Sequence, residues 1–176
     1  RTNAANYYLG QIAETKGDED EARRSYQAVY GGEFYLNAQI RLAILAAQAD
    51  QLDDARARLQ RLRRGYAGEA VRIYRAEAEI LARRDDLESA RRVYDEAVKS
   101  HPKDNDLLYA RAMLAARADR IDDLERDLRD VLSRDPDNAD ALNALGYTLS
   151  DKTDRFEEAK GFIERALKLK PNDHYI

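Results

Sequence analysis

The sequence predicts an all-α fold, a stack of about five helix-turn-helix repeats, and three observations predict it. First, 29 of the 176 residues are alanine, 44% of the chain is hydrophobic, and Cys and Trp are missing, which favours a thin helical core. Second, small residues recur at intervals of about 34 residues, which indicates repeated structural units. Third, Pro102, Pro136 and Pro171 stand one repeat apart, where a proline ends a helix without kinking it.

Each repeat carries one small residue in its first helix and another near the start of its second helix. The first-helix positions are Gly10, Ala43, Ala78, Ala112 and Gly146. The second-helix positions are Ala22, Ala55, Ala90 and Ala159, with Leu124 in the fourth repeat, at spacings of 33, 35, 34 and 35 residues. We expect the small pairs to let two helix backbones cross closely. The predicted single domain has repeats at 3–35, 36–70, 71–104, 105–138 and 139–172, and 173–176 start a further repeat.

The joints and turns between these helices are not all alike. Gly31–Gly32 follows the first repeat, and Gly65 with Gly68 follows the second, where the other repeats have proline. We therefore expect these two joints to bend differently. In the fifth repeat Gly146 precedes its second-helix partner by thirteen residues instead of twelve, which predicts one inserted residue in that turn.

The third and fourth repeats depart from the apolar pattern. Glu77 and Arg111 stand where the helical stripe calls for leucine, and Leu124 is bulky where a small residue is expected. We expect irregular packing at these positions. Acidic pairs such as Asp53–Asp54 recur at the start of second helices, where the helix dipole favours negative charge by about 0.3–1 kcal/mol. They are interpreted as caps and not as catalytic carboxylates.

The sequence contains few residues that could act in catalysis or bind a metal or a cofactor. There are two histidines, His101 and His174, and no cysteine, too few ligands for a zinc site. His101 lies between Ser100 and Pro102 in a predicted turn, where a hydroxyl and an imidazole do not align as nucleophile and base. No glycine-rich phosphate-binding motif appears. We therefore predict that the chain is not an enzyme and has no cofactor and no metal.

Charge and hydropathy limit the partners. The formal net charge of -4 argues against nucleic acid, which basic proteins bind. One predicted helix is rich in arginine, and we interpret it as an outer solvated face because no aromatic residues interleave the basic ones. Its arginines are Arg56, Arg58, Arg61, Arg63 and Arg64. The longest apolar run, Leu42 to Ala47, is far shorter than the roughly 20 residues of a membrane span, which predicts a soluble chain.

The small, apolar and proline positions resemble those of the tetratricopeptide repeat, best in the run LNALGYTLSDKTDRFEEAKGFIERALKLKP. The resemblance implies a right-handed α-solenoid whose first helices line a concave groove for a protein or peptide partner. Mapped residue by residue, it assigns eight candidate side chains to this groove in the third to fifth repeats. They are Arg72, Arg75, Arg83, Tyr109, Met113, Arg117, Asn143 and Tyr147.

Two interpretations of these candidates remain open. Arginines that bind carboxylates, beside Tyr and Met that supply apolar area, are a mixture typical of interface hot spots, which favours an acidic or C-terminal peptide. The Lys and Asn pattern by which chaperone-binding relatives hold a C-terminal carboxylate is absent at the matching places. Alternatively, Arg72, Arg75 and Glu79 pair locally on a solvated face.

A closer resemblance joins two runs, YYLGQIAETKGDEDEARRSYQAVYGGEFYLNAQIRLAILAA and DALNALGYTLSDKTDRFEEAKGFIERALKLKPND. Together they are similar to the repeat region of proteobacterial tetratricopeptide lipoproteins, which act in the periplasm as adaptors for a carboxyl-terminal processing protease. The resemblance implies that the parent protein is periplasmic and anchored to the outer membrane through a segment absent from this chain. It also implies the protease and its protein substrates as partners.

The alternatives are an architectural segment that assembles a larger complex, or a cytoplasmic adaptor. The first predicted helix carries Tyr7, Tyr8 and Leu9 with no polar helix before it, while residues 172–176 start another repeat. Repeat stacks need polar caps to stay soluble. We therefore expect further repeats in the parent protein or self-association through the uncapped ends.

Overall fold

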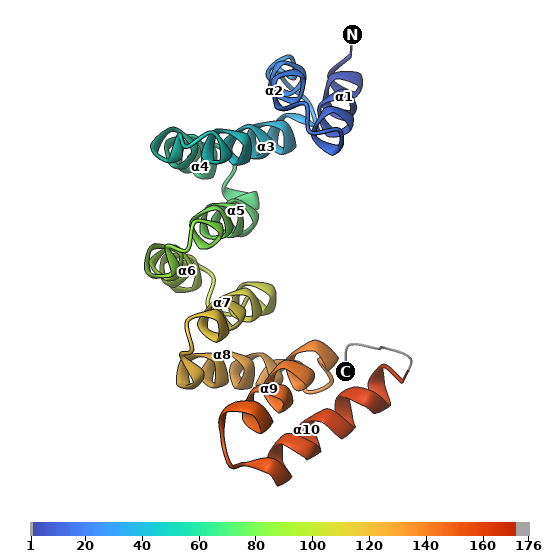
Figure 1. The fold of residues 1–176 in the computed structure, drawn as a ribbon, viewed down its shortest axis with the longest axis vertical. Helices are drawn as coiled ribbons and strands as arrows, with labels where there is room; N and C mark the ends of the chain where they lie inside the picture. Colours follow the sequence, from blue (N-terminus) through green and yellow to red (C-terminus); the bar gives the residue numbers. More distant parts are fainter. Residues whose placement is uncertain (1, 172–176) are drawn as a thin grey trace. The chain divides into compact units, whose positions relative to one another are not determined.

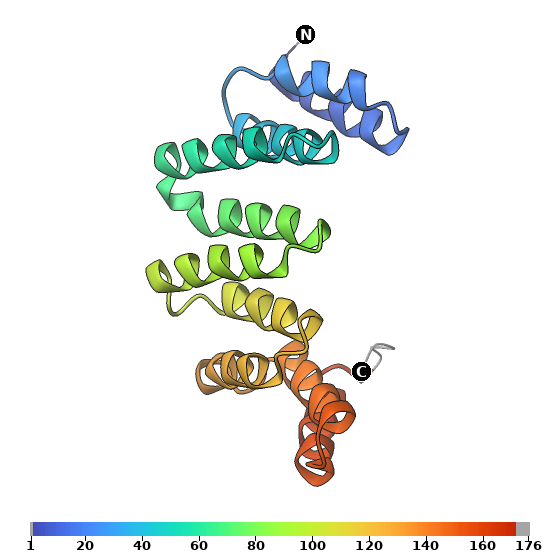
Figure 2. The same ribbon diagram turned by 60° about the vertical axis from the view of Figure 1, so that its left-hand side comes forward.

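The computed structural model describes residues 2–171, and within this range it contains ten α-helices, one short 3-10 helix and no strand. The predicted all-α fold is confirmed. The contacts divide the chain into two compact units, an N-terminal unit up to Arg84 and a C-terminal unit from Asp85 onward. Figure 1 and Figure 2 show that the helices of each unit follow one another in chain order. Each unit is described by itself.

The N-terminal unit contains two helical hairpins and a fifth helix. Its elements are α1 (Asn3–Thr15), α2 (Glu19–Gln27), α3 (Tyr35–Gln48), α4 (Leu52–Gly65), the 3-10 helix η1 (Ala67–Glu69) and α5 (Ala70–Arg83). Helix α1 packs against α2, and α3 packs against α4. Contacts of α2 with α3 and of α4 with α5 join these hairpins into one unit.

The C-terminal unit contains one helix followed by two hairpins. Its elements are α6 (Leu87–Ser100), α7 (Asn105–Arg117), α8 (Ile121–Arg134), α9 (Ala139–Lys152) and α10 (Phe156–Leu169). Helix α7 packs against α8 and α9 against α10, while α6 contacts α7 and α8 contacts α9. The two helices expected for the third repeat, α5 and α6, therefore fall in different units.

The residues at the small positions are buried. All of the alanines named above for the two small positions are at most 1% exposed. A Cβ atom at Gly10 would lie 2.5 Å from the ring of Tyr26, and one at Gly146 would lie 2.7 Å from Ile163 Cγ1 and 3.0 Å from the carbonyl oxygen of Ala159. These distances leave no room for a methyl group, so the close approach of the helices depends on glycine.

The short turns after α1, α3, α5 and α7 share one backbone device. In the first four turns the middle residue has a positive φ, and these residues are Gly17, Asp50, Asp85 and Asp119. In the first, second and fourth turns the next amide donates to a carbonyl five residues back, as in Asp18 to Ala13. This is a Schellman-type helix end, which favours Gly and tolerates Asp at the left-handed position.

The fifth turn ends its helix in another way. Thr153 has an extended backbone with φ -142°, and its hydroxyl donates to the carbonyl of Leu149 at 2.6 Å. This turn again has three residues, Thr153–Arg155, and none has a positive φ. The inserted residue lengthens the first helix of the hairpin relative to α7 and replaces the left-handed corner by a threonine cap.

The joints between hairpins divide into two kinds. Helices α4, α6, α8 and α10 end alike, in a residue with φ near -130° whose amide donates to the carbonyl four residues back. After this common start the second joint continues into η1. The first joint differs from its beginning, because α2 has nine residues and Gly32 adopts a φ of 76°.

The charged residues at the leucine positions are buried in ion pairs. Glu77 is 1% exposed, and its carboxylate accepts from Arg56 at 3.0 Å and from Arg63 at 2.7 Å. Arg111 donates to both carboxylate oxygens of Asp127, at 2.7 and 2.9 Å. Specific pairing thus takes the place of the irregular packing expected there, and Leu124 is fully buried in the cluster around α8.

The interpretation of the arginine-rich helix as a solvated face is wrong for three of its residues. Arg58 is half-buried and donates to Gln39 of α3. Arg63 is 14% exposed, and its guanidinium group lies 4.0 Å from the centre of the Tyr74 ring. Arg56 is half-buried on the other side of Glu77. Helix α4 therefore turns Arg56 and Arg63 toward α5, where they neutralise a carboxylate that would otherwise be buried alone.

Candidate protein-binding surfaces

Three of the eight predicted groove residues lie on α5 in the N-terminal unit, and all three are exposed. Arg83 pairs with Glu79 at 2.6 Å, one helical turn away. Arg72 donates to Asn37 of α3 and lies 3.8 Å from Glu69. Within residues 2–171, Arg75 forms no ion pair that would hold it against the surface. Arginines of α5 therefore pair locally, but among the described residues the expected pairing of Arg72 or Arg75 with Glu79 does not form, because Glu79 pairs with Arg83 and Arg72 with Glu69.

The other five predicted groove residues lie on α7 and α9 in the C-terminal unit. Tyr109 and Met113 are half-buried and pack on the core cluster of this unit. Asn143 is half-buried, Arg117 is exposed, and Tyr147 is 65% exposed. Burial raises the pKa of Tyr109, and the charge of Asp140 raises it further. The phenol therefore remains protonated and can donate a hydrogen bond.

The predicted groove is thus shared between the two units. Each unit holds its own part, the basic α5 surface in one and the aromatic surface of α7 and α9 in the other. We call the second of these the α7–α9 surface, defined by Tyr109, Met113, Asn143 and Tyr147. That both parts form one continuous groove stays a prediction.

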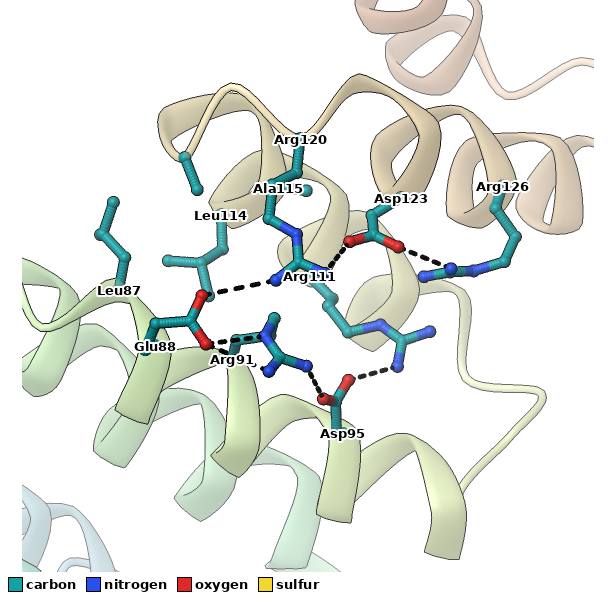
Figure 3. A pocket seen from close by; sticks show the side chains of 11 residues that line it. Leu87, Glu88, Arg91, Asp95, Arg111, Leu114, Ala115, Arg120, Asp123 and Arg126 are labelled. Carbon is teal, nitrogen blue, oxygen red and sulfur yellow. Dashed lines mark hydrogen bonds and ion pairs between the residues drawn. The ribbon is translucent and has the colours of Figure 1, made fainter.

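The sequence did not indicate a cavity of about 410 Å³ in the C-terminal unit, between α6, α7 and α8 (Figure 3). Apolar side chains line part of its wall, among them Leu87, Leu114 and Ala115. Charged side chains from all three helices line the rest. The charged lining residues are Glu88, Arg91, Asp95, Arg111, Arg120, Asp123 and Arg126.

These charged side chains, together with Asp127, form a closed ring in which carboxylates and guanidinium groups alternate. Figure 3 shows most of it, from Arg126 through Asp123, Arg120, Glu88 and Arg91 to Asp95 and Arg111. We call these eight residues the charge ring. In the order Glu88, Arg91, Asp95, Arg111, Asp127, Arg126, Asp123, Arg120 and back to Glu88, the ion pairs measure 3.1, 2.7, 2.9, 2.7, 3.3, 2.7, 2.6 and 3.4 Å.

The arginines of the ring hold two of its acids, Glu88 and Asp123, ionised. The hydrogen bond from Arg91 and its charge lower the pKa of Glu88. Burial acts to raise the pKa of Asp123, but the hydrogen bonds and charges of Arg126 and Arg120 outweigh it and lower that pKa. Burial opposes the charge of Arg111, yet its bonds to Asp127 and Asp95 raise its pKa. Glu88, Asp123 and Arg111 are therefore charged at neutral pH.

The sequence carries part of the signal for this ring. Glu88, Arg91 and Asp95 stand three and four residues apart, a spacing that predicts pairing along a helix. Arg111 stands out because it occupies a leucine position. Its partners could not be identified, because Asp95 and Asp127 each lie sixteen residues away on different helices.

Both ends of the described chain expose apolar side chains. On α1, Tyr8 is 53% and Ile12 51% exposed, and the Tyr8 ring lies 5.6 Å from that of Phe34. On α10, Phe156 is 59% and Leu167 40% exposed. The start of a further repeat expected at 173–176 lies outside the described residues, as does His174.

Two observations on residues 2–171 concern metal binding and the histidine of the described chain. No group of three or more His, Cys, Asp and Glu side chains in residues 2–171 is arranged to hold a metal ion. His101 lies in the joint after α6, with Nδ1 3.4 Å from the carbonyl oxygen of Ala97. Among the helices described, none combines the length and the apolar character of a membrane-spanning segment.

Comparison with known proteins identifies the family. The family described as tetratricopeptide repeat matches residues 40–105, 76–125 and 109–174. The TPR repeat-containing protein PA4667 of Pseudomonas aeruginosa is 42% identical over 174 residues, which cover 99% of this chain and 30% of that protein. The chain thus spans about 30% of the length of this relative.

Solved structures agree on the fold. A crystal structure of MamA has a TM-score of 0.66 at 18% identity, covering 93% of this chain and 95% of that one. MamA 41-end from Desulfovibrio magneticus RS-1 has a TM-score of 0.66 at 13% identity, covering 98% and 97%. At identities this low, the structural similarity shows a shared fold alone. With the helical hairpins, the recurring small residues and the matched repeats in agreement, the chain belongs to the tetratricopeptide repeat family.

Proposed function

We propose that this chain is a non-catalytic adaptor that holds a polypeptide partner on the α7–α9 surface. The observation that carries the proposal is Tyr147, a large aromatic side chain that is 65% exposed on α9. Tyr109 and Met113 supply a packed base on α7. Aromatic side chains on a rigid base are common among the residues that contribute most to protein binding. The interaction role of tetratricopeptide repeats supports the same function.

The polar groups of this surface fit an extended chain. Tyr109 offers a protonated hydroxyl that can donate a hydrogen bond. Asp140 is 62% exposed beside Lys170, 2.6 Å away. Backbone amides and carbonyls of a peptide can pair with these groups while its apolar side chains cover Tyr147. We therefore expect an extended segment with apolar side chains as the ligand.

We further propose that the parent protein works in the periplasm, anchored to the outer membrane, and that its partners are a carboxyl-terminal processing protease and that protease's substrates. The two sequence runs that resemble proteobacterial tetratricopeptide lipoproteins support this proposal. Crosslinking with mass spectrometry on the full-length parent protein tests it. Crosslinks from the described helices to the protease would support the proposal, and a partner set without any protease would contradict it.

A matched pair of variants tests the surface itself. Tyr147→Ser together with Tyr109→Ser should weaken capture of the crosslinked partner about tenfold or more, as expected for interface aromatics. Tyr30→Ser is the control, because Tyr30 is 80% exposed but lies in the joint after α2. The test is a pull-down with circular dichroism on each variant. Equal capture by the double variant and the control would remove the assignment.

A second candidate function is assembly, in which the end of the stack binds a second copy of this chain. The supporting observation is the repeat register of α10. Leu167 matches Val98 of α6 and Leu132 of α8, which pack on the core cluster of their unit. In α10 the same position is 40% exposed. Light scattering over a concentration series tests this function, and a strict monomer at high concentration would exclude it for this chain.

A further inference from the structure

The cavity between α6, α7 and α8 shares no residue with the α7–α9 surface, and its wall carries excess positive charge. The charge ring is neutral as a whole, but Asp127 is 1% exposed and does not line the cavity. The lining residues therefore include four arginines and three acids. A ligand inside the cavity meets more guanidinium groups than carboxylates.

The hydrogen-bonding capacity of the charge ring also favours an anionic ligand. Both oxygens of each carboxylate in the ring already contact a guanidinium group. Within the hydrogen bonds of the charge ring, no arginine uses more than three of its five N–H donors. Four guanidinium groups carry about 20 donors and four carboxylates about 16 lone-pair sites. More N–H donors than lone-pair sites thus remain unused after the ring bonds, which favours an acceptor over a cation as the group bound from outside.

The rest of the wall is aliphatic. Leu87, Leu114, Ala115 and Ala118 line the cavity beside the ring (Figure 3). Its volume of about 410 Å³ falls within the roughly 300–1,000 Å³ of small-ligand pockets. A ligand that fits must therefore combine an anionic acceptor with a short apolar body.

We propose that this cavity binds an aliphatic carboxylate, seated with its oxygens on the free N–H groups of the ring arginines and its alkyl part against Leu87 and Leu114. Two sources carry this chemistry, the C-terminal residue of a polypeptide that ends in an aliphatic side chain and a free small carboxylate. The proposal does not depend on the α7–α9 surface.

Fluorescence polarisation and calorimetry distinguish the sources. One probe is a labelled hexapeptide that ends in leucine with a free carboxylate, its control is the same peptide with a C-terminal amide, and a third probe is 4-methylpentanoate. Binding of the free-acid peptide at least about tenfold tighter than the amide, the effect of one charge-assisted hydrogen bond, supports a polypeptide end. Binding of 4-methylpentanoate without binding of the peptide supports a small molecule.

Two variants locate the binding. Arg120→Gln removes one guanidinium group from the cavity wall and should weaken the probe that binds about tenfold or more. Arg129→Gln is the matched control, because Arg129 also pairs with two acids, Glu125 and Glu158, at a similar exposure but does not line the cavity. Ala118→Leu fills the cavity from its apolar side and should also weaken binding.

Three results would overturn the proposal. They are equal binding of free-acid and amidated peptides without binding of 4-methylpentanoate, binding unchanged by Arg120→Gln, and no binding of any probe at millimolar concentration. Circular dichroism and thermal melting of each variant confirm that the fold is retained. Tyr147→Ser should leave probe binding unchanged, so the failure of this site is distinguishable from the failure of the α7–α9 surface.

Discussion

At the scale of single residues, charged side chains stand at two positions where the repeat pattern calls for leucine, and ion pairs replace the apolar packing there. Glu77 and Arg111 occupy the same place in consecutive repeats with opposite charges. The partners are opposite too, arginines of α4 for Glu77 and acids of α6 and α8 for Arg111. Each charge is neutralised across helices, so both positions still join neighbouring elements.

Because of this pairing, replacing Glu77 by leucine, the residue usual at this repeat position, should destabilise the chain. Glu77→Leu restores leucine but leaves Arg56 and the largely buried Arg63 without their carboxylate. We expect the free energy of unfolding to fall by about 3 kcal/mol, as when one partner of a buried ion pair is removed. Urea denaturation measures it. The control is Glu79→Leu on the same helix, where the exposed pair with Arg83 contributes less than about 1 kcal/mol. Unchanged stability of Glu77→Leu would show that the pair contributes nothing net.

The sequence predicts such residues only in part. Spacing identifies Glu77 and Arg111 as exceptions, because a period of about 34 residues defines the leucine position. Their partners lie fourteen to twenty-one residues away on other helices. Which of several arginines in α4 turns inward depends on how α4 rotates against α5. That rotation is a property of packing and is not encoded in the spacing.

At the scale of helices, contact depends on which glycines face a neighbour. Gly146 faces α10 with Ile163 and Ala159 in direct contact, whereas a methyl group placed on Gly161 of α10 would have no neighbouring atom within 4 Å. Both lie inside helices, where glycine is less favourable than alanine by about 1 kcal/mol. The same substitution should therefore have opposite effects at the two positions.

We expect Gly146→Ala to destabilise the chain by about 1–3 kcal/mol through overpacking, because backbone atoms of α10 cannot move aside cheaply. Gly161→Ala should stabilise it by about 0.5–1 kcal/mol through the unfolded chain and helix propensity. Thermal melting of both variants checks the pair. A stabilised Gly146→Ala would mean that α9 and α10 are farther apart than described.

The acids held by arginine give the C-terminal unit a definite pH response. The hydrogen bond from Arg155 is the largest of the effects that lower the pKa of Glu125, and arginines also lower the pKa values of Glu88 and Asp123. Acids with a lowered folded-state pKa stabilise the fold above their ordinary values of 3.8 to 4.5, and this stabilisation is lost as pH falls further.

We therefore expect the free energy of unfolding to be constant near neutral pH and to fall as pH drops through and below those ordinary values. Urea denaturation between pH 7 and pH 3 measures this change. The combined variant Asp123→Asn and Glu125→Gln should have lower stability at pH 7 and a shallower decline. An equally steep decline in that variant would assign the acid sensitivity to other carboxylates.

At the scale of the whole molecule, the repeat pattern predicts the order of the hairpins better than their grouping. Within each unit consecutive helices contact one another, as expected of repeat proteins whose stability is a sum of local terms. The spacing predicts five similar repeats, yet the contacts form two units that divide at Arg84 and Asp85. Some of the predicted groove residues therefore belong to one unit and some to the other. The repeat spacing could not indicate this division, because it assigns the same helix face to every repeat.

The last prediction concerns whether one partner uses both units. If a single extended polypeptide lies along α5 and the α7–α9 surface, Arg75→Gln and Tyr147→Ser should each weaken capture of the same partner, and their losses of binding free energy should add, because the two residues do not share a contact. Titration of the partner against both single variants and the double variant measures this. Arg61→Gln, an exposed arginine on α4, is the control for lost charge. If Arg75→Gln matches Arg61→Gln while Tyr147→Ser weakens capture, only the C-terminal unit binds, and the basic surface of α5 is a solvated face.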